Sequence, residues 1–198
     1  MKKILLSFLV LISSTLASFA DGNSASAVFN VTIPRFVKVE AISSPVLTAN
    51  ITDRTGNLYT PLSTTFKVIS NSAEKTTLYL KANTVTDGGF EEAMFEQGGR
   101  VYIAFANLAN KPKSQALANC KMGALPKASP GVVAYPVTSI SGAKSRYLQG
   151  QGKYEVYAEN GTTLVTVNVG SNVLKSSFAG NDPKGFYQAV LSLTEADI

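Results

Sequence analysis

Apolar and polar side chains alternate along the N-terminal part of the chain. Every second residue from 25 to 33 is apolar: Ala25, Ala27, Phe29, Val31 and Ile33. This period predicts a strand with one buried face. Pro34 interrupts the pattern, which resumes at Val37. A strand that proline separates from the next one can leave its own domain, so we hypothesise that it pairs with a neighbouring molecule. The alternative is that it is the first strand of its own domain.

Two later stretches predict β-hairpins. In residues 66–81, two alternating segments flank a polar turn at residues 71–75. In residues 154–169, segments rich in Val, Thr and Tyr flank Asn160-Gly161. Asn-Gly favours a tight type I′ turn because both residues tolerate positive φ angles. We therefore expect each pair of segments to form two neighbouring, paired strands.

Further strands and two short helices complete the expected fold. Strands are predicted at 101–105, at 132–137 with a break at Pro136, and at 185–194, where apolar residues alternate. Helices are predicted at 90–96 and 114–122. Many strands at even spacing, joined by polar turns, predict an all-β, immunoglobulin-like Greek-key β-sandwich.

The first twenty residues have the pattern of an export signal. Lys2 and Lys3 precede an apolar run from Ile4 to Ile12, and small residues precede a cleavage point ahead of Asp21. The apolar run is too short for a membrane-spanning helix. We expect a signal peptide at residues 1–20, a donor-strand arm at 21–34 and a β-sandwich domain at 35–198. The signal predicts an exported protein.

The composition removes the commoner catalytic designs. The chain has no histidine and one cysteine, so no Ser/His/Asp or Cys/His pair and no zinc cluster can form. Glu91 and Glu92 are adjacent and would point to opposite faces of a strand. We expect no enzyme, no catalytic residue, no metal and no cofactor. Cys120 is expected to be a buried small residue; the alternative is a disulfide between molecules.

Basic residues gather in the middle of the sequence. Between Gln97 and Tyr154 there are eight basic residues and no acidic one. Such a block could contact an anionic surface, pair with acidic parts of a neighbouring subunit, or remain solvated. Few aromatic residues accompany it, so nucleic acid is not an expected partner. The candidate contacts for an anionic surface are Lys111, Lys113, Lys121, Lys127, Lys144 and Arg146.

Three segments together resemble a known family. The alternating arm at 24–42, the segment TTFKVISNSAEKTTLYLKA at 64–82 and the closing GFYQAVLSLT at 185–194 are similar to those of pilin and capsule-like subunits assembled by the chaperone-usher pathway. The chain lacks the paired cysteines of type 1 pilins. It ends in Glu195-Ala196-Asp197-Ile198, where many such subunits have a penultimate aromatic residue. These departures favour a capsule-like or alternative branch.

The resemblance implies a structural function. Subunits of this family have an incomplete sandwich, and the arm of the next subunit completes it by β-strand addition. Phe29, Val31 and Ile33 would fill pockets of the groove, with Ala25 and Ala27 in shallower ones. The implied partners are other copies of the subunit, a periplasmic chaperone and an outer-membrane usher, with a host glycan or anionic surface as an adhesion target. The product would be a fimbria or capsule-like fibre on the cell surface, reached through the periplasm. The alternative is a monomeric exported β-sandwich that binds carbohydrate or another surface ligand.

Overall fold

A computed structural model of the protein describes residues 12–15, 28–51, 61–123, 131–170, 174 and 183–196. The chain divides into two units, residues 1–35 and 36–198. This division falls one residue beyond the boundary expected after Pro34. In the first unit, β1 (Ile12–Thr15) and β2 (Val28–Val31) form an antiparallel pair.

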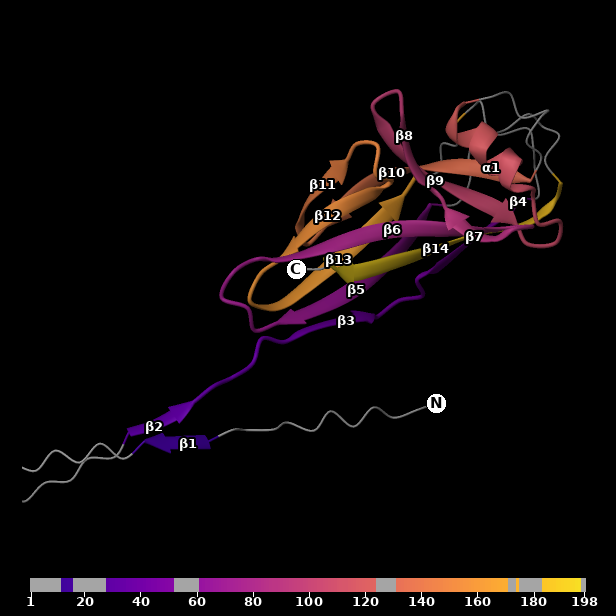
Figure 1. The fold of residues 1–198 in the computed structure, drawn as a ribbon. Coiled ribbons are helices and arrows are strands. Elements are labelled where there is room, and N and C mark those ends of the chain that lie inside the picture. Colours follow the sequence, from indigo (N-terminus) through magenta and orange to yellow (C-terminus); the bar gives the residue numbers. More distant parts are fainter. Residues whose placement is uncertain are drawn as a thin grey trace, which may run out of the picture. The chain divides into compact units, whose positions relative to one another are not determined.

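The described part of the second unit is a large antiparallel sheet with one short helix, α1 (Ser114–Lys121), as Figure 1 shows. Its mostly β character agrees with the sequence prediction. The twelve strands are β3 (Val37–Ala41), β4 (Val46–Ile51), β5 (Leu62–Ser70), β6 (Thr76–Thr86), β7 (Gly89–Glu92), β8 (Met94–Gln97), β9 (Arg100–Asn107), β10 (Val132–Ser141), β11 (Lys144–Leu148), β12 (Lys153–Ala158), β13 (Gly161–Val169) and β14 (Gly185–Glu195).

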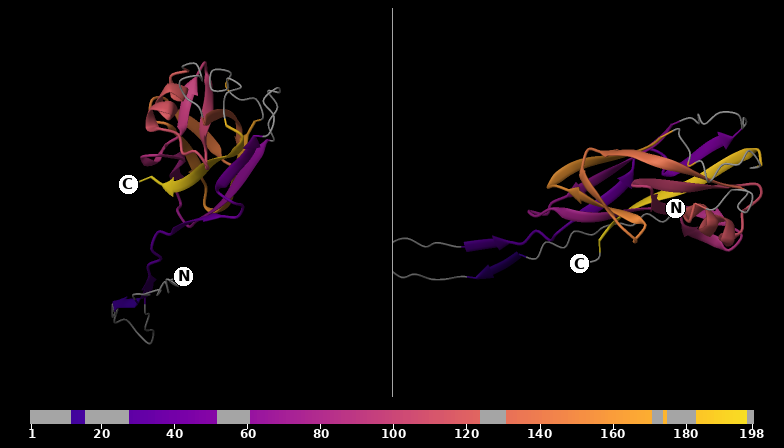
Figure 2. Two further views of the ribbon diagram at one scale, coloured as in Figure 1. Left: turned by 90° about the vertical axis from the view of Figure 1, so that its right-hand side faces the viewer. Right: turned by 90° about the horizontal axis from the view of Figure 1, so that it is seen from above.

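The strands follow one hydrogen-bonded path. Its order is β11-β12-β6-β14-β9-β10-β13-β5-β3, with β4 paired to β14, β7 to β6 and β8 to β9. Figure 2 gives two further views of these strands. The β10 strand connects the two parts of the path, because its first half pairs with β9 and its second half with β13. The register shifts between Val137 and Ser139, where the partner changes.

Strand β10 is longer than the sequence predicts. The expected break at Pro136 is wrong, because the strand continues through Pro136 to Ser141. Proline is tolerated in a strand where the hydrogen-bond ladder is irregular. Pro136 lies at such a place, beside the register shift at Val137.

The core takes side chains from both parts of the path. Phe66 and Val68 of β5 and Leu78 and Leu80 of β6 are all at most 4% exposed and belong to one buried cluster. In each strand the buried residues alternate with partly exposed ones. The alternation seen in the sequence therefore identified the inward faces of these strands correctly.

Both predicted hairpins are wrong, although their strands exist. Strand β5 pairs with β3 and β13, whereas β6 pairs with β12, β14 and β7. Where the chain passes from one to the other, the Ser70 and Thr76 hydroxyls lie 2.9 Å apart and buried. The polar turn thus joins two strands whose apolar faces meet in the core, which buries more apolar area than a flat hairpin would.

The Asn160-Gly161 turn behaves in the same way. Gly161 has a φ of 95°, as a tight turn requires. However, β12 pairs with β11 and β6, whereas β13 pairs with β10 and β5. The hairpins that the structure does contain include β8–β9, turned at Gly98-Gly99, and β11–β12, turned at residues 149–152.

One of the two predicted helices is present. The prediction at 114–122 is confirmed by α1. The prediction at 90–96 is wrong, because this segment forms β7 and β8, which pair with β6 and β9. Ala93, Met94 and Phe95 between and within these strands are buried. Tertiary pairing therefore overrides the local preference of this short segment.

The connection from β10 to β11 depends on a glycine. Gly142 has a φ of +82°, and a Cβ added there would collide with the carbonyl oxygen of Leu164. Gly150 has a similar φ of +72° and nothing within 4 Å of an added Cβ. Positive φ costs other residues about 1–2 kcal/mol. We expect Gly142→Ala to lower the free energy of unfolding clearly more than Gly150→Ala, measured by urea denaturation. Equal losses would contradict the collision.

Candidate subunit interface

Strand β2 and the residues just after it expose the apolar row that the sequence predicts. Phe29, Val31 and Ile33 are 73%, 65% and 75% exposed, and Val28 on the other face is 56% exposed. Ala25 and Ala27 lie outside the described residues. Three large apolar side chains in alternating positions therefore remain accessible, whereas most described side chains of this size in the second unit are buried or partly buried. Large contiguous apolar patches on a surface often bind another molecule, so this row is a candidate interface.

The pairing of β2 uses residues of the predicted signal peptide. Val28, Phe29, Asn30 and Val31 lie opposite residues 15, 14, 13 and 12 of β1, in that order. If the first twenty residues are cleaved, β2 loses this partner strand. Its backbone N–H and C=O groups would then be available to another sheet edge.

The second unit offers an open edge at β3. Among the described strands, β3 pairs with β5 alone. Asn71 N–H donates to the Phe36 carbonyl (3.2 Å) and Ile42 N–H to the Thr65 carbonyl (3.0 Å). The backbone N–H and C=O groups of the even-numbered residues of β3 therefore point toward β5. Backbone groups alternate in an antiparallel strand. The backbone N–H and C=O groups of Val37 and Val39 therefore point away from β5.

A second open edge lies along the C-terminal half of β14. The β4 strand covers one edge of β14 from Gly185 to Val190, and Leu191 N–H donates to the Pro45 carbonyl (2.9 Å). The opposite edge pairs with β9 and β6. Beyond Leu191, none of the described strands pairs with the β4-side edge at Leu193.

The two open edges lie near each other. Cα atoms of β3 and β14 approach within 8 Å although the strands are not paired. Paired strands are about 4.8 Å apart, so a strand between two edges needs them to separate to roughly 10 Å. The inward side chains at this place are already covered: Leu191 is 2% and Leu193 6% exposed. The edges are thus open for backbone pairing, while the adjacent side-chain row is packed.

The candidate basic contacts are divided by the fold. Lys144 and Arg146 are exposed on β11, two residues apart and therefore on the same face. Lys121 ends α1 and lines a depression together with Tyr147, which projects from the other face of β11. Lys111 and Lys113 are exposed in the segment before α1, and Lys127 lies outside the described residues.

The depression beside Lys121 is lined by charged, polar and aromatic side chains. It has a volume of about 590 Å³ and is bordered by the turns after β8 and β11. The rings of Tyr147 and Tyr154 meet edge to face at 5.1 Å. Burial raises the pKa of Tyr154 to about 12, and Tyr147 and Glu96 add to the rise. Tyr154 therefore stays neutral at physiological pH.

The residues that the sequence offered for chemistry are separated. Glu91 accepts a hydrogen bond from the Thr86 hydroxyl (2.7 Å), and bonds from Ser114 and Thr86 lower its pKa. Glu92 is exposed, lies opposite Asn83 and points the other way, as expected for neighbours in a strand. Cys120 is a free cysteine, 1% exposed, which confirms the prediction of a buried residue. Within the described ranges, no cluster of three or more His, Cys, Asp or Glu side chains could hold a metal ion.

Sequence reasoning did not identify the open edges. An open edge can be recognised only when the pairing partners of every strand are known. The sequence pattern does not reveal the pairing partner of any strand. The apolar closing strand, with Tyr187, Ala189, Leu191 and Leu193 facing inward, was the one signal that pointed to this region.

Comparison with known proteins gives no match: no family model matches the chain, and no significant similarity is found to a curated protein or to a solved structure. In the part of the chain that the structure describes, no helix has the length and apolar character needed to cross a membrane.

Proposed function

We propose that the protein is a structural subunit of a bacterial surface fibre, a fimbria or capsule-like polymer, in which the arm of one copy pairs with an open sheet edge of the next. The observation that carries this proposal is the exposed apolar row of Phe29 and Val31 in β2 and Ile33 just after it. Its backbone partner β1 falls within the predicted signal peptide. Strand addition would satisfy the backbone groups and bury the apolar row.

The finer fold that we infer is a two-layered, immunoglobulin-like sandwich. The core unites residues of β5 and β6, which are consecutive in the chain and unpaired with each other. Two strands that share a core without pairing are the arrangement expected of opposite layers. In this reading, an added strand between β3 and β14 would complete the sandwich.

Assembly would require helpers and no cofactor. Unpaired strand edges and exposed apolar rows promote aggregation before assembly. We therefore propose a periplasmic chaperone that covers them and an outer-membrane usher that catalyses the exchange. The assembled strand would separate slowly, because its apolar side chains and its ladder of hydrogen bonds must be released together.

A monomeric exported domain that binds carbohydrate or another surface ligand is the second candidate. The burial of Leu191 and Leu193 favours it, because the core beside the open edge of β14 is already covered without an added strand.

Electron microscopy of cells that express and export the complete chain separates the two candidates. The fibre proposal predicts thin surface fibres that an antibody against this protein labels along their length. It also predicts that most of the exported protein sediments as large assemblies. Exported protein that is entirely monomeric, on cells that also produce a periplasmic chaperone and an outer-membrane usher, would contradict the proposal and support the monomeric binder.

A further inference from the structure

Strands β11, β12 and β6 carry several positive charges on the face turned away from the core. Their register places Lys153 opposite Lys81, Glu155 opposite Tyr79 and Arg146 opposite Glu155. Residues directly opposite each other share one face of the sheet. The residues between them, including Leu78, Leu80 and Val156, point the other way and are buried. We call the outward set Tyr79, Lys81, Lys144, Arg146, Lys153, Glu155 and Tyr157 the cationic face.

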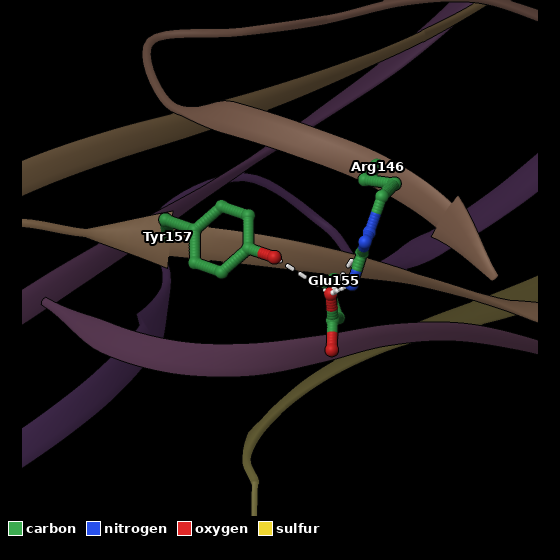
Figure 3. A network of polar contacts seen from close by, with 3 residues as sticks. All are labelled: Arg146, Glu155 and Tyr157. Atoms are coloured by element: carbon green, nitrogen blue, oxygen red, sulfur yellow. Dashed lines mark hydrogen bonds and ion pairs between the residues drawn. The ribbon is translucent and has the colours of Figure 1, made fainter.

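Glu155 is the one carboxylate of this set, and its Oε2 atom is engaged by hydrogen bonds. Glu155 Oε2 accepts hydrogen bonds from Arg146 Nη2 (2.5 Å) and Nε (3.2 Å) and from the Tyr157 hydroxyl (2.6 Å), as Figure 3 shows. These bonds, that of Tyr157 first, lower the pKa of Glu155. Glu155 therefore balances Arg146, and the charges of Lys81, Lys144 and Lys153 remain. Glu92, which lies opposite Asn83 at the border of the face, offsets one of them.

The arrangement of two lysines points to an anionic ligand. Lys81 and Lys153 lie directly opposite each other, and like charges in this position destabilise a sheet. The Lys153 ammonium lies 3.7 Å from the centre of the Tyr79 ring, which offsets part of this repulsion. An anion bound between the two lysines would remove the remaining repulsion. No acidic side chain of the three strands faces Lys81, because Glu155 lies opposite Tyr79.

The surface favours an extended anion over a membrane. None of the exposed large apolar side chains among the described residues lies on β6, β11 or β12, so these strands offer nothing to insert into a bilayer. Adjacent strands are about 4.8 Å apart, so Lys81 and Lys153 lie close together across the sheet, whereas Lys144 lies opposite Tyr157, four residues or roughly 13 Å further along β12. Tyr79 and Tyr157 add ring surface beside the charges. A depression of about 530 Å³, lined in part by Lys144, Tyr157, Lys75 and Glu159, adjoins one end.

We propose that the cationic face binds an acidic polysaccharide, whose sulfate or carboxylate groups contact Lys81, Lys153 and Lys144 while its sugar rings lie against the tyrosines. The binding does not depend on fibre formation, because all of the residues belong to one sheet of one molecule. If the protein forms fibres, repetition of the face along the fibre would strengthen attachment through multivalency.

Binding of the complete exported protein to heparin, used as a sulfated polysaccharide probe, tests this proposal. In low salt, Lys81→Gln with Lys153→Gln should weaken binding about tenfold or more, and salt should weaken binding of the unchanged protein. The matched control is Lys111→Gln with Lys113→Gln, which removes equal charge from the segment before α1 and should change binding less than twofold. Uncharged dextran should not bind.

Three results would overturn the proposal. They are an equal loss of binding in both double variants, heparin binding that is insensitive to salt, and binding to anionic phospholipid vesicles without binding to heparin. Lys144→Gln, at an exposed position, provides a second variant if the Lys81 and Lys153 pair impairs folding. It should weaken heparin binding severalfold, and unchanged binding would contradict the proposal. Fibre formation should be unaffected in every variant, so failure of this proposal and failure of the fibre proposal are distinguishable.

Discussion

Replacing Phe29, Val31 and Ile33 together by aspartate is expected to abolish fibres and to leave the exported protein as monomers. All three side chains are exposed in the arm. Burying each of them at an interface contributes roughly 1.5–3 kcal/mol. Since about 1.4 kcal/mol is a factor of ten in affinity, losing all three weakens the contact by at least roughly a thousandfold. Electron microscopy and sedimentation of the exported protein measure the effect.

The matched control places the same charges on the other face of the arm. Ser26, Asn30 and Thr32 alternate with the apolar row, so replacing them by aspartate adds the same charge and keeps the apolar face. This control should still form fibres, whereas deletion of residues 21–33 should behave as the first variant does. Fibres in the first triple variant would contradict strand donation. Equal loss in both triple variants would show that added charge, and not the apolar face, is responsible.

The alternation of apolar residues was sufficient to locate strands and not sufficient to pair them. It identified the inward faces of β5 and β6, and the two faces of β14, because burial on one side of a strand leaves a two-residue period. The same period is found whether the next strand lies beside it or across the core. The turns at 71–75 and at Asn160-Gly161 therefore looked like hairpin turns, although their strands belong to different parts of the path.

The two candidate surfaces differ in how much the sequence reveals. The apolar row of the arm is continuous in sequence, so residues 29, 31 and 33 could be singled out directly. The cationic face combines residues from β6, β11 and β12, and only the register places Lys81 opposite Lys153. The basic block in the sequence included Lys144, Arg146 and Lys153 but not Lys81, and it also contained lysines that the fold places elsewhere.

Replacing Phe105 by alanine is expected to remove a large part of the stability of the second unit. Phe105 of β9 is fully buried, and its ring centre lies 4.7 Å from that of Tyr135 on β10. Both strands lie where the path passes from β14 to β13. The cavity that the substitution leaves would therefore open at the junction of the two parts of the path. Substitutions of buried Phe by Ala cost about 3–5 kcal/mol. Proteins of this size are stable by roughly 5–15 kcal/mol.

Phe186 provides the matched control, because it has the same side chain and is 56% exposed on the outward face of β14. Phe186→Ala should lower the free energy of unfolding by about 1 kcal/mol or less. In urea, the midpoint should fall by more than about 1 M for Phe105→Ala and by much less for Phe186→Ala. Similar shifts would mean that the two parts of the path do not share one core at β9 and β10. The layered arrangement on which strand completion depends would then lose its support.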